Sequence, residues 1–270
     1  MQHLFMKNTP RIIISKKYIF CFALSIPSFI GFFIFWVLPF IENFIYMVAD
    51  GSFAENVQYL CTNKYFLLAI KNTVIFTGIA ALSAVCISFI MAILTLKAAS
   101  NISFIRNALF LSVILPSAVI VIIWQLLFWD TAPFNTLFLV YLWKYSGLYY
   151  VLILTALASI DQNILDAAVI DGANYKNLVV HIMIPSIVPT LFFTYILSIS
   201  DSLKIFRESY LLYGAYPDKE VYMLQNFINN HFDKLNYNYI STVSILLLLI
   251  VYIIIAVFGV IEKKWSDQIW

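Results

Sequence analysis

Long apolar runs separated by short polar stretches dominate this sequence. Six stretches contain no Asp, Glu, Lys or Arg: Tyr18–Ile41, Asn72–Leu96, Asn107–Trp129, Tyr145–Ile160, Ile182–Ser200 and Leu235–Ile261. About 20 apolar residues in a helix cross the roughly 30 Å core of a bilayer. The fourth stretch is shorter, and we expect it to extend back through Leu142 and Trp143. The pattern predicts an all-α integral membrane bundle of six transmembrane helices.

Composition supports a membrane protein and argues against a soluble one. Hydrophobic residues make up 63% of the chain and charged residues 11%, whereas a soluble domain is about half apolar and a quarter charged. The net charge of +2 gives no indication of a nucleic-acid partner. His3, His181 and His231 are isolated from one another, and the cysteines Cys21, Cys61 and Cys86 show no paired spacing. We therefore expect no metal site, no catalytic group and no cofactor held by this chain.

The distribution of basic residues predicts the orientation in the membrane. Residues 1–17 form a basic tail, and the apolar run after it is too long for a signal peptide, so we expect it to be retained as the first span. Cytoplasmic loops are enriched in Lys and Arg. The prediction is a cytoplasmic tail 1–17, a transmembrane domain 18–262 and a cytoplasmic tail 263–270. The loop 161–185 then faces the cytoplasm and the loop 201–234 faces outward.

The segment between the fourth and fifth spans carries its own helix signals. Asp161 is a suitable N-cap, Gln162–Ile170 can form a short helix, and Gly172 suits the left-handed position after a helix end. Asn174 can cap a second helix that runs until Pro185.

Helical spacing places Leu165, Ala168 and Val169 on one face of the first helix. A helix this short is not stable alone. We therefore expect it to need a partner surface, reached through Asp166 and the small residues beside it.

This loop resembles the EAA loop of binding-protein-dependent ABC importer permeases. The family pattern is E-A-A, three residues, G, nine residues and I-x-L-P; this chain has Asp166-Ala167-Ala168, Gly172 and Ile182-Met183-Ile184-Pro185 at the same spacing. Lys71-Asn72-Thr73 and Ala156-Leu157-Ala158-Ser159-Ile160 resemble the carbohydrate-type subgroup, of the first-subunit type found in maltose, glycerol-phosphate and multiple-sugar permeases. One departure is Tyr213-Gly214-Ala215-Tyr216-Pro217, where the subgroup often has T-G-G-G-P.

The resemblance implies an import function shared among several subunits. The implied partners are a second permease, two ATP-binding-cassette subunits, an extracellular solute-binding lipoprotein and a sugar, in a bacterial plasma membrane. The chain has no G-x-x-x-x-G-K-[ST] motif, so ATP and Mg²⁺ would be bound by the partner ATPase. The residues implied to couple to that ATPase are Asp166, Ala167, Ala168, Asp171, Gly172, Ala173 and Pro185.

Polar residues within the spans are candidates for the substrate path. Tyr195, Ser198 and Ser202 recur on one helical face, and Gln125 and Tyr149 lie in other spans. Sugars stack on aromatic rings and bind hydroxyl and amide groups. Serines and tyrosines also join helices to one another in membranes, and the sequence leaves both roles open.

Three alternatives remain at this point. The first is an ABC permease for a non-sugar solute such as an oligopeptide, a polyamine or phosphate. The second is a membrane-embedded enzyme acting on a lipid-linked substrate, which should show paired carboxylates or His clusters at a membrane edge. The third is a secondary transporter, which would need ionisable residues within spans and usually internal repeats. The loop pattern favours the sugar-type ABC permease.

Overall fold

The structure is a computed structural model that describes residues 16–49, 53–98, 102–128 and 131–269, and its regular structure there is helical. In chain order the elements are α1 (Lys16–Phe32), η1 (Phe33–Val37), α2 (Leu38–Ala49), α3 (Phe53–Thr62), α4 (Lys64–Ala98), α5 (Ile102–Ile114), α6 (Ser117–Leu127), α7 (Pro133–Ala158), α8 (Gln162–Ile170), α9 (Tyr175–Leu178), η2 (Val179–Met183), α10 (Ile184–Leu203), α11 (Phe206–Tyr213), α12 (Leu224–Phe232) and α13 (Tyr237–Ile269). The elements η1 and η2 are π-helical turns. The predicted tail 1–17 lies outside the described residues except for its last two. The all-α class is confirmed.

Five helical segments in the described part of the chain are long and apolar enough to cross a membrane. They are Phe22–Val48, Lys64–Lys97, Pro133–Ala158, Tyr175–Tyr213 and Tyr237–Lys264. These segments overlap the predicted first, second, fourth, fifth and sixth spans. Each helix runs further than its predicted span in at least one direction.

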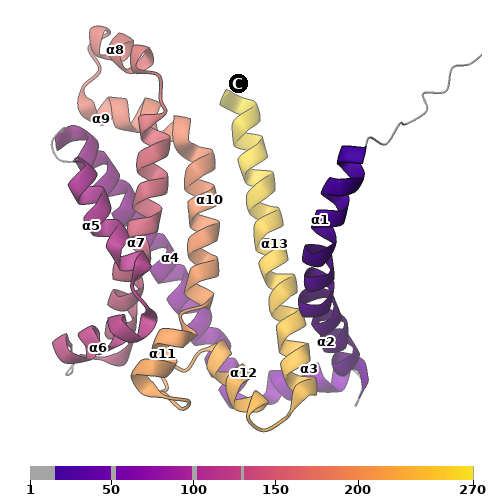
Figure 1. The fold of residues 1–270 in the computed structure, drawn as a ribbon. Coiled ribbons are helices and arrows are strands. Elements are labelled where there is room, and N and C mark those ends of the chain that lie inside the picture. The colour runs from indigo at the N-terminus through magenta and orange to yellow at the C-terminus, as the bar shows by residue number, and fades with distance from the viewer. Residues whose placement is uncertain (1–15, 50–52, 99–101, 129–130, 270) are drawn as a thin grey trace, which may run out of the picture.

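The predicted third span, Asn107–Trp129, is wrong as a single helix. The α5 helix ends at Ile114 and α6 begins at Ser117, with Pro116 between them at φ −59° and ψ 141°. Proline has no N–H to continue a helix and disfavours helical backbone in the residue before it. With 13 residues, α5 is about 20 Å long. Figure 1 shows α5 beside α7 and α6 turned across one end of the bundle.

The two ends of the bundle carry different elements (Figure 1). The short helices α3, α6, α11 and α12 gather at one end, here called the capped end. The α8 helix lies beyond the opposite end, where α1 begins and α13 ends. The sequence left the structure of the connection 201–234 open; its first residues complete α10, and α11 and α12 form much of the rest.

Two charged residues that border the charge-free stretches lie inside helices. Lys144 is within α7, where its ammonium pairs with the buried carboxylate of Glu208 on α11. Asp201 is within α10, where its carboxylate accepts a hydrogen bond of 3.1 Å from the Tyr149 hydroxyl. A buried charge is tolerated when it is paired or hydrogen-bonded. These partners are distant in sequence, which explains why the charge pattern misplaced the boundaries.

Close packing of α4, α5, α7 and α10 forms the centre of the bundle. Ala80, Ala81 and Ala84 of α4 are fully buried and let the α7 backbone approach closely. Gly147 on α7 has the same effect toward α5, because a Cβ at this position would lie 2.1 Å from the Leu109 carbonyl oxygen. Only glycine fits there.

Helices α1, α2 and α13 expose their apolar side chains. The α13 helix packs along α2, yet Phe35 and Trp36 between α1 and α2 are 77% and 72% exposed. Tyr252 and Val260 on α13 are 68% and 70% exposed. Apolar surface of this extent suits contact with lipid or with another helical subunit.

Candidate functional site

The α8 helix begins with the N-cap that the sequence predicts. The Asp161 side chain accepts a hydrogen bond of 3.0 Å from the Asn163 backbone N–H, one of the donors that a helix start leaves unpaired. The N-cap prediction is confirmed.

The end of α8 is closed by a Schellman motif around Gly172. Gly172 has φ +86°, which L side chains rarely adopt. Its N–H donates to the Val169 carbonyl at 3.0 Å, and the Ala173 N–H donates to the Ala168 carbonyl at 2.9 Å. The left-handed glycine predicted after α8 is confirmed.

A second helix follows at once and leads into the bundle. The Asn174 side chain accepts from the Asn177 backbone N–H at 2.9 Å, which confirms the predicted cap of α9. The expected helix end at Pro185 is wrong, because α10 continues through it to Leu203. The π-helical turn Val179–Met183 precedes Pro185, and such a turn absorbs the helical hydrogen bond that proline cannot make.

One face of α8 packs on the bundle while the other faces outward. Leu165 and Ala168 are half-buried against the core cluster around Ile153 and Leu178. Val169, predicted to share that face, is 60% exposed, so this part of the prediction is wrong. The bundle-facing side of α8 is therefore formed by Leu165 and Ala168.

The outward face of α8 combines small, apolar and acidic side chains. Ile170 is 84% exposed and Ala167 is also exposed. Asp166 is exposed and its Oδ1 accepts from the Gln162 amide at 2.9 Å. Asp171 and Gly172 continue this exposed surface. The face is therefore apolar at its centre with carboxylates beside it.

Tyr175 attaches this loop to the end of α4. Its hydroxyl donates to the Ile93 carbonyl at 3.3 Å, and the Lys97 ammonium lies 5.3 Å from its ring centre. Both the ring and the cation favour this arrangement. The loop is thereby attached to α4 as well as to α10, which continues from it.

A buried polar cluster connects α7 and α10 inside the bundle. The Tyr141 hydroxyl bonds with Ser198 Oγ at 2.7 Å and lies 3.3 Å from the Tyr149 hydroxyl. Tyr149 donates in turn to Asp201. These side chains are buried, and Ser198 Oγ also donates to the Ala81 carbonyl of α4 at 3.2 Å. The cluster offers hydroxyl and carboxylate groups that can bind polyols.

The five substrate-path candidates do not form one site in this conformation. Tyr149 and Ser198 belong to the buried cluster, and Ser202 lies one turn further, donating to Thr77 Oγ1 at 3.0 Å. Tyr195 packs against Phe258 beside an apolar cavity. Gln125 is exposed on α6 at the capped end.

A model of the protein family described as binding-protein-dependent transport system inner membrane component matches residues 102–267. The match covers more than half of the chain. This chain belongs to that family. It is a multi-pass transmembrane transport subunit of the inner membrane, and not an enzyme in itself.

Three relatives of this inner membrane component are sugar-transport permeases by name. The multiple sugar-binding transport system permease protein MsmF of Streptococcus mutans is 29% identical over 130 residues, which is 48% of this chain and 43% of MsmF. The arabinooligosaccharides transport system permease protein AraP of Bacillus subtilis is 24% identical over 71% of both chains. The trehalose/maltose transport system permease protein MalF of Thermococcus litoralis is 29% identical over 46% of this chain and 43% of its own.

Solved structures show the same fold. A chain of a bacterial ABC transporter involved in the import of the acidic polysaccharide alginate matches with a TM-score of 0.81 at 18% identity, over 92% of this chain and 96% of that one. The MetNI methionine ABC transporter matches with a TM-score of 0.58 at 15% identity, over 74% and 96%. These identities support the permease fold alone.

Sequence reasoning missed part of the polar interior of this permease. Asp201 follows Ser198 by three residues, and that spacing alone could have placed it on the candidate face. The group formed by Lys144, Glu208 and Ser117 left no such signal, because Ser117 Oγ donates to Glu208 across 91 residues of sequence at 2.6 Å. Among the described residues, no cluster of His, Cys, Asp and Glu could hold a metal ion.

Proposed function

We propose that this chain is the permease subunit of an ATP-driven importer for a sugar or oligosaccharide, with α8 docking an ATPase subunit. The sugar assignment is supported by the names of MsmF, AraP and MalF. The docking role rests on one observation: α8 is fixed at both ends, yet no residue in it is buried and Ile170 is 84% exposed. An exposed isoleucine on so short a helix gains stability when a groove of another protein covers it.

The exposed face sets the chemistry of the groove. Ile170 and Val169 require an apolar floor, and Ala167 permits close backbone approach. Asp166 and Asp171 require a Lys or Arg at the groove edge. Gly172, Ala173 and Pro185 shape the loop that presents this face. In the complete importer the partner ATPase supplies ATP and Mg²⁺, so none of these residues contacts nucleotide.

The proposed orientation follows from α8. Its end of the bundle faces the cytoplasm, both termini lie on that side, and the capped end faces outward. The α5 helix, together with the adjoining residues before α6, adds one crossing to the five long helices and is the third in chain order. The exposed faces of α1, α2 and α13 contact lipid and a second permease subunit. An extracellular solute-binding protein delivers the sugar to the capped end.

ATP-driven closure of the ATPase moves α8, and α10 and α4 follow through the π-helical turn and Tyr175. The ATPase can drive this only by binding the two conformations with different free energies. About 5.5 kcal/mol is needed to shift a population from 1:99 to 99:1. In the other conformation Tyr149, Ser198 and Ser202 exchange their interhelical hydrogen bonds for sugar hydroxyls, with Tyr195 and Gln125 further along the path.

Charge reversal at Asp166 tests the docking. Asp166→Lys should abolish co-purification of the ATPase subunits and sugar uptake, because it places a cation against the basic groove edge. Asp218→Lys is a matched control, since Asp218 is exposed in the segment between α11 and α12. It should leave ATPase co-purification unchanged. Full retention of the ATPase by the Asp166→Lys variant would exclude α8 as its docking site.

A further inference from the structure

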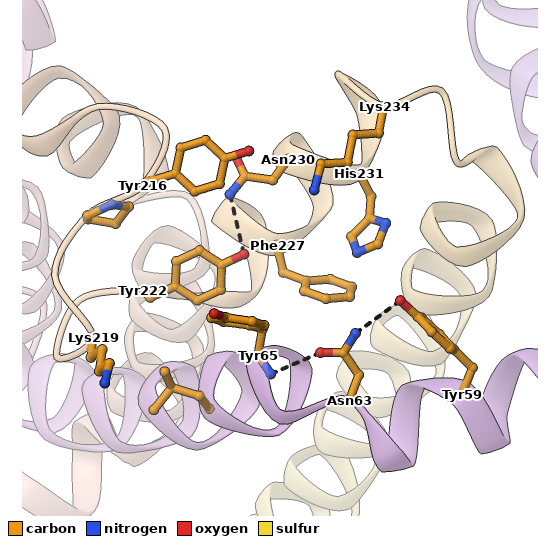
Figure 2. Close-up of a pocket in the computed structure, with 12 residues that line it drawn as sticks. Tyr59, Asn63, Tyr65, Tyr216, Lys219, Tyr222, Phe227, Asn230, His231 and Lys234 are labelled. Atoms are coloured by element: carbon orange, nitrogen blue, oxygen red, sulfur yellow. Dashed lines mark hydrogen bonds between the residues drawn. The ribbon is translucent and has the colours of Figure 1, made fainter.

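A cavity of about 550 Å³ lies at the capped end, where the first residues of α4 meet α12. It is bounded by the end of α3 and the start of α4, by α12, and by the segment between α11 and α12 (Figure 2). This volume falls within the range of pockets that hold small ligands, about 300–1,000 Å³. None of the substrate-path candidates lines it.

Aromatic rings line the cavity both at its base and at its opening. Tyr222 and Phe227 are buried at its base, in a core cluster that also contains Leu60 and Phe66. Tyr65 and Tyr216 are 66% and 70% exposed at the opening. The ring centres of Tyr65 and Tyr222 lie 6.3 Å apart, in an edge-to-face arrangement. Exposed rings above a rigid aromatic base offer faces on which a sugar ring can stack.

Amide groups provide polar contacts between these rings. The Asn230 amide donates to the Tyr222 hydroxyl at 3.3 Å, and Asn230 is 96% buried, with 4% of its surface exposed. Asn230 Oδ1 is buried and accepts no hydrogen bond among the described residues. A buried acceptor without a donor is unfavourable. A ligand hydroxyl that reaches this oxygen would supply the missing donor.

The wall of the cavity is held in place by α4. The Asn72 side chain donates to the Lys219 carbonyl at 2.6 Å and to the Tyr222 carbonyl at 3.0 Å. Thr73 Oγ1 accepts from the Leu224 backbone N–H at 2.9 Å. The Lys71-Asn72-Thr73 segment therefore fixes the far wall across about 150 residues of sequence. The wall of the pocket is therefore held in one position by hydrogen bonds to α4.

The charges around the cavity disfavour cationic ligands. Its charged lining residues are Lys219 and Lys234, and no acidic residue lines it. Burial lowers the pKa of His231, with Lys234 adding to the effect, and burial raises the pKa of Tyr222. Both side chains are therefore neutral near pH 7 and act as hydrogen-bonding groups.

We infer that this cavity binds a saccharide unit at the outer mouth of the permease, with a sugar ring on Tyr65 and Tyr216 and a hydroxyl on Asn230. The inference rests on the proposed sugar import and on the outward orientation of the capped end. The site would hold a saccharide before it reaches the interior of the bundle.

The test uses the complete transporter purified in lipid nanodiscs. Cells expressing it are first offered maltotriose, arabinotriose and raffinose, and the sugar that they take up serves as the probe. Binding is measured by saturation-transfer NMR without the solute-binding protein. The variants Tyr65→Ala and Tyr216→Ala should each weaken probe binding about tenfold. Tyr252→Ala is the matched control, because Tyr252 is 68% exposed on α13 and lies outside the cavity.

Three outcomes are decisive. A tenfold loss in both pocket variants with an unchanged control supports the site. Sugar uptake by the parent transporter with unaltered binding in Tyr65→Ala and Tyr216→Ala overturns this site and leaves the proposed function standing. Uptake of none of the three sugars overturns the proposed function and the inference together. Spermidine serves as a cationic probe, and its binding in the same cavity in preference to the sugars would also overturn the inference.

Discussion

The Tyr149 hydroxyl donates a hydrogen bond of 3.1 Å to the Asp201 carboxylate, joining α7 to α10 inside the bundle. Both residues are buried. Lys204 approaches the other carboxylate oxygen at 3.4 Å but is itself largely exposed. Placing an acid within the membrane costs free energy, and such acids are usually functional. The hydrogen bond between Tyr149 and Asp201 is therefore a suitable target for mutation.

Removing the Tyr149 hydroxyl should destabilise the bundle. Tyr149→Phe leaves a buried carboxylate without its closest donor, which costs about 1–3 kcal/mol. Tyr150→Phe is the matched control, since the Tyr150 hydroxyl bonds at 3.1 Å to the neutral Thr95. Thermal unfolding in nanodiscs should show the larger loss for Tyr149→Phe. Equal losses would mean that Asp201 does not depend on this donor.

The two glycines Gly172 and Gly78 should respond oppositely to alanine. Gly172 has φ +86°, so Gly172→Ala costs about 1–2 kcal/mol and should loosen α8. Gly78 is exposed within α4 with open space around it, so Gly78→Ala should be neutral or stabilising by up to about 1 kcal/mol. Thermal unfolding and recovery of the ATPase subunits give the two readouts. A Gly172→Ala variant as stable as Gly78→Ala would contradict the Schellman geometry.

Breaking the Lys144–Glu208 pair on one side should be worse than removing both charges. Lys144→Met leaves Glu208 buried and unpaired, which costs about 3–5 kcal/mol. The double variant Lys144→Met, Glu208→Gln should recover most of that loss. Folded yield and thermal unfolding measure both variants. If the double variant is less stable than Lys144→Met alone, the pairing is not what keeps Glu208 in place.

Acidification should loosen α12 through His231. Burial and Lys234 lower its pKa below the usual 6.5. The Asn236 amide lies 3.3 Å from Nδ1, and the rings of Phe227 and Tyr239 flank the imidazole. The unfolded segment therefore binds more protons than the folded one, and stability falls as the pH drops below about 6.5.

Hydrogen exchange of the α12 peptides, corrected for the intrinsic rate, measures this effect. Protection should decrease between about pH 7.5 and about pH 5.5. His231→Gln should remove most of the pH dependence because glutamine does not titrate. Undiminished protection of α12 in the parent protein at the lower pH would contradict the lowered pKa.

Local chemistry made the caps and turns of the loop 161–185 predictable from sequence. Asp161, Gly172 and Asn174 act through backbone groups within a few residues of themselves, so their roles follow from position alone. The family pattern added the outward face. Long-range contacts were not accessible in the same way. Lys144 and Asp201 border charge-free stretches, and their partners Glu208 and Tyr149 lie 64 and 52 residues away in the sequence.

The break in the third span illustrates the other limit. Pro116 is compatible with either a kinked or a broken membrane helix, and the sequence around it does not separate the two. In the structure, Ser117 at the start of α6 donates to Glu208 on α11, which holds α6 against the capped end. The proposed substrate path could be predicted less well still, because Tyr149, Ser198 and Ser202 bond to neighbouring helices in this conformation.

The close contact between Gly147 of α7 and Leu109 of α5 limits how these two helices can move relative to each other. A Cβ at Gly147 would lie 2.1 Å from the Leu109 carbonyl oxygen, so the two backbones are in direct contact and leave no space for rotation at this point. Nearby, Ser112 Oγ donates a hydrogen bond of 3.3 Å to the Lys144 carbonyl. Helices α5 and α7 should therefore move together as one rigid unit. The solute pathway would then open between other pairs of helices. Cross-links designed to trap it should join those pairs and not α5 to α7.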